Sequence, residues 1–242
     1  MRLHVTGATG YLGSELVRLQ PEASTERVEI RDGEAVRALF ERLRPDVVIH
    51  TAYRQEADDV NTVGAENVAA AAAAVRARLV HLSTDVVFDG RKGAPYVEAD
   101  PPCPLTDYGR AKAEAERRVA AAHPGALLIR TSLLYGGAEP SKHELAARDP
   151  RLTFFTNEVR SPVHVIDLAS ALLELVELEA AGPLHVAGAD AVSRAEFAEL
   201  LSGAAVRTAP APDTRPLDCS LDSSRAQALL RTRLRGVREV LA

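Results

Sequence analysis

Tyr108 and Lys112 are four residues apart, the spacing at which two side chains lie on the same face of a helix. An ammonium group near a phenol favours ionisation of the phenol, and a hydroxyl group from a neighbouring strand can hold a substrate oxygen beside both. Thr84 follows the apolar run at residues 79–83 and is one candidate for that hydroxyl group, and Ser83 is another that the pattern does not separate from it. These residue types predict proton transfer to or from a substrate oxygen.

The N-terminal segment contains three closely spaced glycines, in the run Gly7-Ala8-Thr9-Gly10-Tyr11-Leu12-Gly13. The run follows an apolar segment and opens a helical pattern. In such a loop the first glycine permits a tight turn, the second lets the backbone approach a pyrophosphate, and the third allows the helix to pack closely on the strand. The segment therefore predicts a dinucleotide site with the phosphates at the N-terminus of the helix.

Charged side chains of both signs occur at residues 27–32, where the second strand of a dinucleotide-binding fold would end. Glu29 and Asp32 are candidates to bind the ribose hydroxyls of NADH, whereas Arg27 and Arg31 would favour the 2′-phosphate of NADPH. We expect NADPH or NADH as the cofactor, and the sequence leaves the choice between them open.

Short apolar runs alternate with helical patterns in the first half of the chain. We predict strands at residues 3–6, 47–51, 79–83 and 127–131, a weaker strand at 27–30, and helices at 11–19, 36–43, 64–75 and 108–122. This alternation is typical of an α/β fold with a Rossmann-type, doubly wound parallel sheet of about six strands.

The regular alternation is lost after Gly136-Gly137. We therefore expect an NAD(P)-binding Rossmann domain at residues 1–137 and, at 138–242, mainly a small substrate-binding lobe that can return elements to the sheet. Within this lobe we predict helices at 166–179 and 194–201 and a strand at 184–187. The active site should lie between the two parts, at the carboxyl ends of the strands.

Composition narrows the class of protein. Of 242 residues, 46% are hydrophobic and 26% are charged, and the formal net charge is -5, which favours neither disorder nor binding to nucleic acid. Cys103 and Cys219 form no CxxC pair, and the histidines show no metal-binding spacing, so we predict neither a disulfide framework nor a metal site. We find no signal or membrane segment and expect a cytoplasmic protein.

Several motifs resemble, in the same order, those of the extended short-chain dehydrogenase/reductase family, particularly its dTDP-4-dehydrorhamnose reductase branch. They are the glycine loop from Thr6 to Gly13, residues 45–52, Val60-Asn61, residues 83–90, residues 108–112, Arg130 to Ser132 with Tyr135-Gly136, and Arg215-Pro216 before Ser220 to Asp222. The Ser-Thr-Asp-Val-Val-Phe-Asp-Gly run at 83–90 is the specific element, because the glycine loop and the YxxxK spacing belong to the superfamily generally. The resemblance covers nearly the whole chain.

The resemblance implies NAD(P)H-dependent reduction of the 4-keto group of a nucleotide-linked deoxysugar, in the synthesis of dTDP-L-rhamnose. Tyr108 would donate a proton to the nascent alkoxide. Lys112 would lower the pKa of the phenol and hold the nicotinamide ribose, and Thr84 would orient the keto oxygen.

The same resemblance implies further ligand contacts. The residues at the cofactor would be Gly10, Tyr11 and Leu12 at the pyrophosphate and Thr51, Ala52 and Tyr53 along the cleft. On the substrate side, Asp85 would contact the sugar, and Leu133 occupies a position where relatives commonly carry an aromatic residue. A substrate diphosphate needs a cation, for which Arg160 and Arg215 are the candidates.

Two other functions remain open. A sugar-nucleotide epimerase or dehydratase has the same fold and the same Tyr/Lys pair but regenerates its cofactor. Some relatives of this branch are non-catalytic nucleotide-binding subunits of other enzymes. A homodimer is also compatible with the sequence.

Overall fold

The structure is a computed structural model that describes residues 1–54 and 58–241. Its first half contains β1 (Leu3–Thr6), α1 (Tyr11–Leu19), α2 (Gly33–Leu43), β2 (Val47–His50), the π-helix η1 (Val60–Gly64), α3 (Ala65–Ala74), β3 (Arg78–Thr84), the 3₁₀-helix η2 (Asp85–Val87), α4 (Asp107–Ala122) and β4 (Leu127–Thr131). Its second half contains β5 (Leu134–Tyr135), α5 (Lys142–Ala147), β6 (Thr153–Phe155), β7 (Val159–Arg160), β8 (Val163–His164), α6 (Val165–Leu175), β9 (Gly182–His185), β10 (Val192–Ser193), α7 (Arg194–Ser202), β11 (Arg207–Ala209), α8 (Ser224–Leu229) and α9 (Val237–Leu241).

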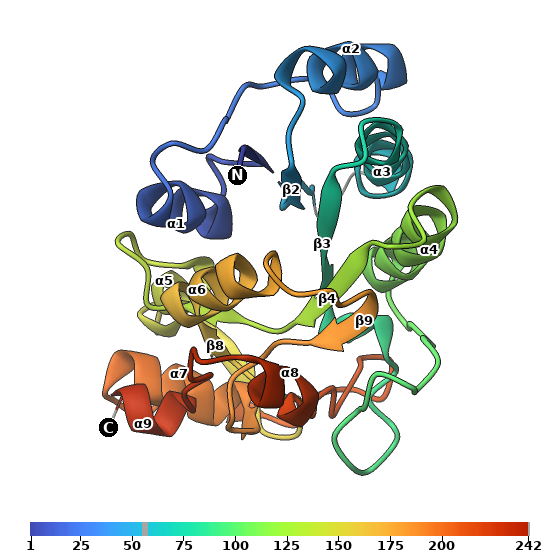
Figure 1. Ribbon diagram of the computed structural model, residues 1–242. Coiled ribbons are helices and arrows are strands. Elements are labelled where there is room, and N and C mark those ends of the chain that lie inside the picture. Colours follow the sequence, from blue (N-terminus) through green and yellow to red (C-terminus); the bar gives the residue numbers. More distant parts are fainter. Residues whose placement is uncertain (55–57, 242) are drawn as a thin grey trace.

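A parallel sheet in the order β1-β2-β3-β4-β9 forms the centre of the molecule. Alternate side chains of each strand enter two different cores. On one face Val5, Ile49 and Ile129 pack with α1 and α6, and on the other Val48 and Leu79 pack with α2, α3 and α4. Figure 1 shows α1 and α6 on one side of the strands and α3 and α4 on the other. The predicted α/β, doubly wound Rossmann class is confirmed.

The weaker strand predicted at 27–30 is wrong. Within residues 24–30 only Ser24 pairs with β1, through a bridge to His4, and residues 25–30 lie outside the sheet. Ile30 is buried in the α2/α3 layer, while Glu26, Arg27 and Glu29 are exposed. A single buried apolar residue gives this segment little reason to continue along the edge of the sheet, because strand pairing is stabilised by side chains packing on a face.

Local capping fixes where the helix bearing the Tyr/Lys pair begins. The Thr106 side chain accepts a hydrogen bond from the Gly109 N–H and caps α4. Tyr108 therefore lies in the first turn of this helix, next to the carboxyl end of β3, with Lys112 one turn further along.

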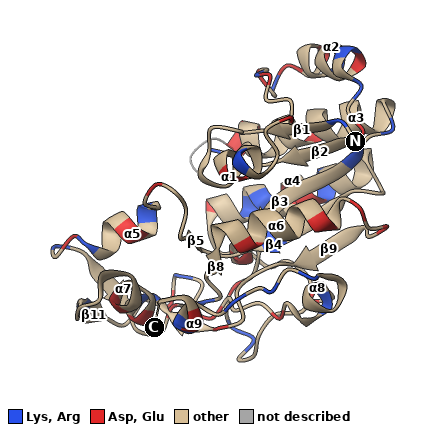
Figure 2. Ribbon diagram, turned by 60° about the vertical axis from the view of Figure 1, so that its left-hand side comes forward, with Lys and Arg blue, Asp and Glu red and all other residues tan. Residues whose placement is uncertain are grey.

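The helices and strands after residue 138 belong partly to the central sheet and its covering layer and partly to a separate group of helices. Although β9 and α6 follow residue 138, they belong to the central sheet and its covering layer. Helices α5 and α9 both pack on α7, and Figure 2 shows this group apart from α2 and α3. The division at residue 137 into two domains stays a prediction. No helix within residues 1–54 and 58–241 is long and apolar enough to cross a membrane.

Candidate active site

The glycine loop is a close-packed backbone cradle. Gly7 has φ +71°, and a Cβ there would lie 2.6 Å from the Ala52 nitrogen. A Cβ at Gly13 would lie 2.2 Å from the Gly7 carbonyl oxygen, so α1 can start this close to β1 only without a side chain. Gly10 donates its N–H to the Gly7 carbonyl at 2.9 Å, and a Cβ at Gly10 would be 3.2 Å from that oxygen, with open space beyond it. The tight turn at Gly7 and the close packing at Gly13 are as the sequence predicted, and the approach of a pyrophosphate at Gly10 stays a prediction.

A cavity of about 890 Å³ opens beside this loop. Among the predicted cofactor residues, its lining includes Gly7, Thr9, Gly10, Glu29, Thr51, Ala52 and Tyr53. The Thr51 hydroxyl donates to the Thr6 carbonyl at 2.7 Å and so ties the ends of β1 and β2 together. The predicted residues from three separate segments are therefore brought to one cavity.

Tyr11 and Leu12 lie outside that lining. The Tyr11 hydroxyl accepts a hydrogen bond from the Gly137 N–H at 2.7 Å and donates to Glu144 at 3.3 Å, and Leu12 is buried against the α1/α6 core. Contacts of these two residues with a pyrophosphate can therefore involve only their backbone. The Tyr11 side chain instead joins the glycine loop to the segment that leads into α5.

The charges at the outer end of the cavity are already partly paired. Arg31 donates to both carboxylate oxygens of Glu29 at 3.0 Å and to Asp59 at 3.1 Å. Asp32 caps α2 by accepting from two backbone N–H groups. Arg27 lines the cavity and forms no ion pair with any residue that the structure describes. Glu29 is thus less available to a ribose hydroxyl than the sequence predicted.

Thr84 and Tyr108 meet at the carboxyl end of β3. Burial, with Tyr53 and Asp85 nearby, raises the pKa of the Tyr108 phenol well above its usual value, and hydrogen bonding with Thr84 acts in the opposite direction. Ser83, the other hydroxyl candidate, faces the opposite way and donates to the buried Glu116 carboxylate at 2.5 Å. The structure therefore favours Thr84 over Ser83 as the hydroxyl beside the phenol.

Lys112 is buried beneath the site. Its ammonium donates to the Leu82 carbonyl and lies 3.5 Å from Nε2 of His81. Burial lowers the pKa of Lys112 to about 8, although Glu116 opposes the change. The geometry does not support the prediction that Lys112 lowers the pKa of Tyr108, because the phenol pKa is raised and the ammonium is directed elsewhere.

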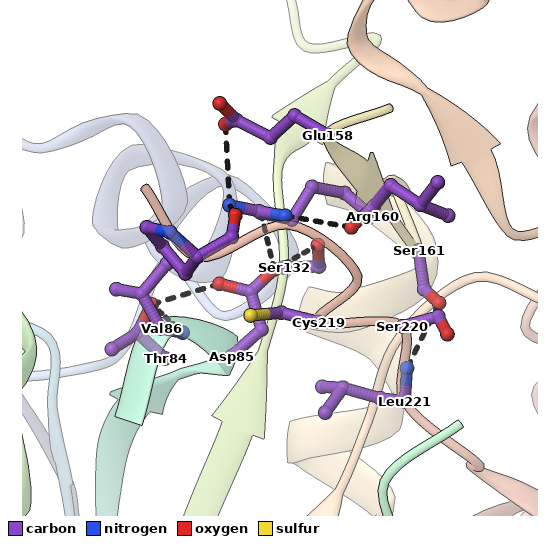
Figure 3. Close-up of polar contacts among 12 residues, drawn as sticks. Thr84, Asp85, Val86, Ser132, Glu158, Arg160, Ser161, Cys219, Ser220 and Leu221 are labelled. Atoms are coloured by element: carbon purple, nitrogen blue, oxygen red, sulfur yellow. Dashed lines mark hydrogen bonds and ion pairs between the residues drawn. The ribbon is translucent and has the colours of Figure 1, made fainter. Parts of the chain in front are cut away.

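Asp85 forms a buried junction between β3, β4 and the second half of the chain. Its carboxylate accepts from the hydroxyls of Thr84 at 3.1 Å and Ser132 at 2.5 Å, and the Arg160 guanidinium lies 3.7 Å away. Figure 3 shows Asp85 between these three side chains. Burial nevertheless raises the pKa of Asp85, since desolvation outweighs these contacts. A role in contacting the sugar would be indirect, through Thr84.

The two candidate cations for a diphosphate differ sharply. Arg160 is 3% exposed and donates to Glu158 and to the carbonyl oxygens of Val159, Pro216 and Leu217. This geometry does not support direct binding of a substrate by Arg160. Arg215 is half exposed, donates to Glu158 at 2.8 Å and lies over the Phe155 ring at 5.0 Å. Leu133, the remaining candidate, packs beside the buried Tyr135 cluster.

Three charged or titratable residues of the second half, Arg194, Lys142 and His143, were not predicted as site residues. Arg194 begins α7 directly after the capping residue Ser193, and burial lowers its pKa. Burial and the positive charge of Arg194 lower the pKa of Lys142 in α5. Burial and the charges of Arg194 and Lys142 lower the pKa of His143 to about 3. The sequence offered only an arginine after a helix cap, which occurs on many solvent-exposed helices. No group of three or more His, Cys, Asp or Glu side chains could hold a metal ion in the described ranges.

Residues 1–242 match the family described as RmlD substrate binding domain. The chain belongs to this family. A dTDP-4-dehydrorhamnose reductase of Mycolicibacterium smegmatis is 35% identical over 99% of this chain and 84% of the relative. The methionine adenosyltransferase 2 subunit beta of Rattus norvegicus is 30% identical over 94% of this chain and 82% of the relative.

Solved structures agree with membership of the RmlD family. The crystal structure of a dTDP-4-dehydrorhamnose reductase from Bacillus anthracis in complex with NADP has a TM-score of 0.86 with this chain. The two are 26% identical, and the match covers 99% of this chain and 96% of that one. The resemblance drawn from the motifs of the sequence is confirmed.

Proposed function

We propose that this protein reduces the 4-keto group of a nucleotide-linked deoxysugar, with dTDP-4-dehydrorhamnose as the substrate and NADPH or NADH as the cofactor. The observation that carries the proposal is the buried Tyr108 phenol beside Thr84, one helical turn from Lys112, at the carboxyl end of β3. The neighbouring strand β2 leads directly into residues 51–53, which line the glycine-loop cavity. The dTDP-4-dehydrorhamnose reductases among its relatives support this reading.

The cradle fits a dinucleotide. Gly7 and Gly13 allow the loop to close without a Cβ, and the open side of Gly10 leaves room for a pyrophosphate at the start of α1. Thr51, Ala52 and Tyr53 would line the path from the pyrophosphate towards Tyr108, and Lys112 would hold the nicotinamide ribose. When bound, the reduced cofactor supplies the hydride.

The raised pKa of Tyr108 suits a proton donor, because the phenol remains protonated at neutral pH. Thr84 would orient the keto oxygen. Its single hydroxyl hydrogen can be donated either to Asp85 or to the Tyr108 phenol oxygen, so donation to a substrate requires the hydroxyl to turn away from both. Asp85 would still accept from Ser132 after that rotation.

The second half would supply the cations for the substrate diphosphate. Arg215 offers a half-exposed guanidinium, and Arg194 brings a second positive charge towards Asp85 and Glu158. A planar guanidinium can bind two phosphate oxygens at once. Arg160 would hold β7 and residues 216–217 together behind them.

The test is oxidation of NADPH and of NADH in the presence of dTDP-4-dehydrorhamnose, comparing the wild type with Tyr108→Phe. Tyr135→Phe is the matched control, because it removes a fully buried phenol whose hydroxyl has no hydrogen-bond partner among the described residues and which lies in the cluster with Phe197, away from Thr84. We expect Tyr108→Phe to fold and to lose about 10²–10⁴-fold in kcat. Full activity in that variant would overturn the proposed role of Tyr108.

A second candidate function comes from the methionine adenosyltransferase relative, which is by its name a subunit. A nucleotide-binding subunit would bind cofactor and copurify with a larger partner but would not consume NADPH. An epimerase would instead retain tightly bound NAD and also show no net consumption. Wild-type turnover that depends on Tyr108 separates the reductase from both.

We further propose that the protein acts in the cytoplasm as a homodimer. The compartment is inferred from the sequence, whose two cysteines form no CxxC pair and predict no disulfide framework. Size-exclusion chromatography with light scattering tests the assembly state directly.

A further inference from the structure

A row of buried polar side chains leads from Lys112 across the sheet to the glycine loop. Nε2 of His81 lies 3.5 Å from the Lys112 ammonium, and the His81 ring stacks on that of His50 with centroids 5.2 Å apart. These two histidines are partners in the β2/β3 register. Nδ1 of His50 lies 2.6 Å from the Thr6 hydroxyl, and Thr6 directly precedes Gly7. The proposed reduction uses none of these contacts.

Both imidazoles are held neutral. His50 and His81 are 2% and 1% exposed, and burial, with the Lys112 charge beside them, lowers the pKa of each. A neutral His81 can accept a hydrogen bond from the ammonium only through Nε2, which places its proton on Nδ1. Nδ1 has no hydrogen-bond partner among the described residues. A buried N–H without a partner is costly, so the contact of Nε2 with the ammonium is the interaction that favours this tautomer.

The other groups around Lys112 do not replace this acceptor. Glu116 follows Lys112 by one turn of α4, but its carboxylate accepts from Arg130 of β4 at 2.8 Å and from Ser83 of β3. Tyr108, one turn earlier, faces Thr84. From β2 the titratable group that faces the lysine is His50, behind His81. Only His81 and the Leu82 carbonyl therefore receive the hydrogens of the ammonium in the described part of the chain.

We propose that His81 is a positioning residue for Lys112: its neutral imidazole, held in place by the stack on His50, accepts a hydrogen bond from the ammonium and fixes it near the carboxyl end of β3. The proposal rests on the proposed function only in so far as Lys112 serves the nicotinamide ribose. Loss of the acceptor destabilises the charged lysine, so the pKa of Lys112 should fall further.

The chain makes this measurable without a cofactor or a substrate. It contains lysines only at positions 92, 112 and 142, so a protein labelled with [¹³Cε]lysine gives three signals whose titration is followed by NMR, and Lys112→Met assigns the relevant one. We expect the Lys112 signal of the wild type to titrate at about pH 8. In His81→Leu the midpoint should fall by about one pH unit, the size expected for a hydrogen bond to a charged group.

Two variants separate this role from packing. His81→Gln places an amide oxygen near the position of Nε2 and should restore the midpoint towards that of the wild type. His4→Leu removes another buried histidine from the same face of the sheet, one that contacts Ser24 and Phe40, and should leave the midpoint unchanged. If His81→Leu does not fold, His81→Asn replaces it, because its shorter amide cannot reach the ammonium. An unchanged midpoint in the leucine or asparagine variant, or an equal shift in His4→Leu, would overturn the proposal.

A second readout reports the consequence for the cofactor. NADPH affinity, measured by fluorescence across pH 6 to 10, should fall at alkaline pH as Lys112 loses its proton. This fall should occur at a lower pH in His81→Leu than in the wild type, and His81→Gln should reverse the change. A wild type that binds NADPH but does not turn over the sugar nucleotide would end the proposed function and leave this test intact. If NADPH affinity falls at the same pH in all variants, His81 does not position Lys112.

Discussion

The cofactor side and the substrate side of the site are held by different kinds of contact. On the cofactor side, Gly7, Gly10 and Gly13 come from one short loop, and backbone atoms in close contact set its shape. On the substrate side, Glu158 joins Arg160 to Arg215, a residue 57 positions beyond Glu158 in the chain. One side depends on the absence of side chains, and the other depends on three charged ones.

This difference predicts different responses to substitution. A steric cradle changes when an atom is added, whereas a buried ion network changes when a charge is removed. Cofactor binding should therefore withstand loss of the Glu158 network, and sugar binding should withstand small changes at Gly10. Substitutions on each side of the site test this separation.

Glu158→Gln should have the largest effect on stability. It leaves the Arg160 guanidinium, 3% exposed, without its nearest carboxylate, and removing one partner of a buried pair costs about 3–5 kcal/mol. Denaturant unfolding measures the loss. Glu114→Gln, which alters a more exposed pairing with Arg117 and Arg118, should shift the unfolding midpoint much less. Equal losses in the two variants would contradict the importance of burial.

Gly13→Ala should come next. Its Cβ would lie 2.2 Å from the Gly7 carbonyl oxygen, so the loop must shift, at about 1–3 kcal/mol, and NADPH affinity should fall with it. At Gly10 the nearest atom to a new Cβ is 3.2 Å away, so Gly10→Ala should keep its stability and weaken only cofactor binding. Unfolding curves and NADPH titrations on both variants distinguish the two cases. Normal NADPH affinity in both variants would show that the glycine loop does not bind the cofactor.

The sequence predicted the shape of the glycine loop well because its signal is local. Spacing alone indicates where a glycine must stand, and the four-residue spacing of Tyr108 and Lys112 indicates one face of a helix. The parallel strands were likewise predicted from short apolar runs, apart from residues 27–30, where exposed charges occupy most positions.

The substrate side could not be predicted in the same way. Whether Arg160 faces a ligand or a set of carbonyl oxygens depends on how residues 216–217 pack against β7, which no local pattern specifies. The same holds for Arg194, since its neighbours Glu158 and Asp85 come from different parts of the chain. Long-range pairing of charges decides these roles, and a motif records only the residue types.

Lys112→Met should stabilise the protein at neutral pH. The pKa of Lys112 falls from its usual 10.5 to about 8 on folding. Below pH 8 both states carry the charge and the folded state bears the full cost of burying it, and above pH 10.5 both are neutral and the cost is gone. The variant should therefore be more stable by about 1–3 kcal/mol at pH 7, an advantage that shrinks as the pH rises from about 8 to about 10.5. Chemical unfolding of both proteins at several pH values measures it. An advantage that is constant with pH would point to packing instead.

The smallest predicted effect concerns the choice of cofactor. Arg27 lines the cavity without an ion pair among the described residues, whereas Glu29, the group suited to ribose hydroxyls, is bound by Arg31. This arrangement favours a 2′-phosphate, because the free charge is positive and the negative one is occupied. Arg27→Ala should therefore raise the KM for NADPH about tenfold, equivalent to about 1.4 kcal/mol, and leave that for NADH nearly unchanged.

Arg31→Ala provides the matched comparison at the same end of the cavity. It releases Glu29 to the ribose hydroxyls and should improve the use of NADH, which Arg27→Ala does not do. Steady-state rates with both cofactors measure each change. If neither substitution alters the ratio of the two KM values, residues 27–31 do not distinguish the 2′-phosphate of NADPH from the 2′-hydroxyl of NADH. The selectivity of the cofactor side would then come from the glycine loop and residues 51–53.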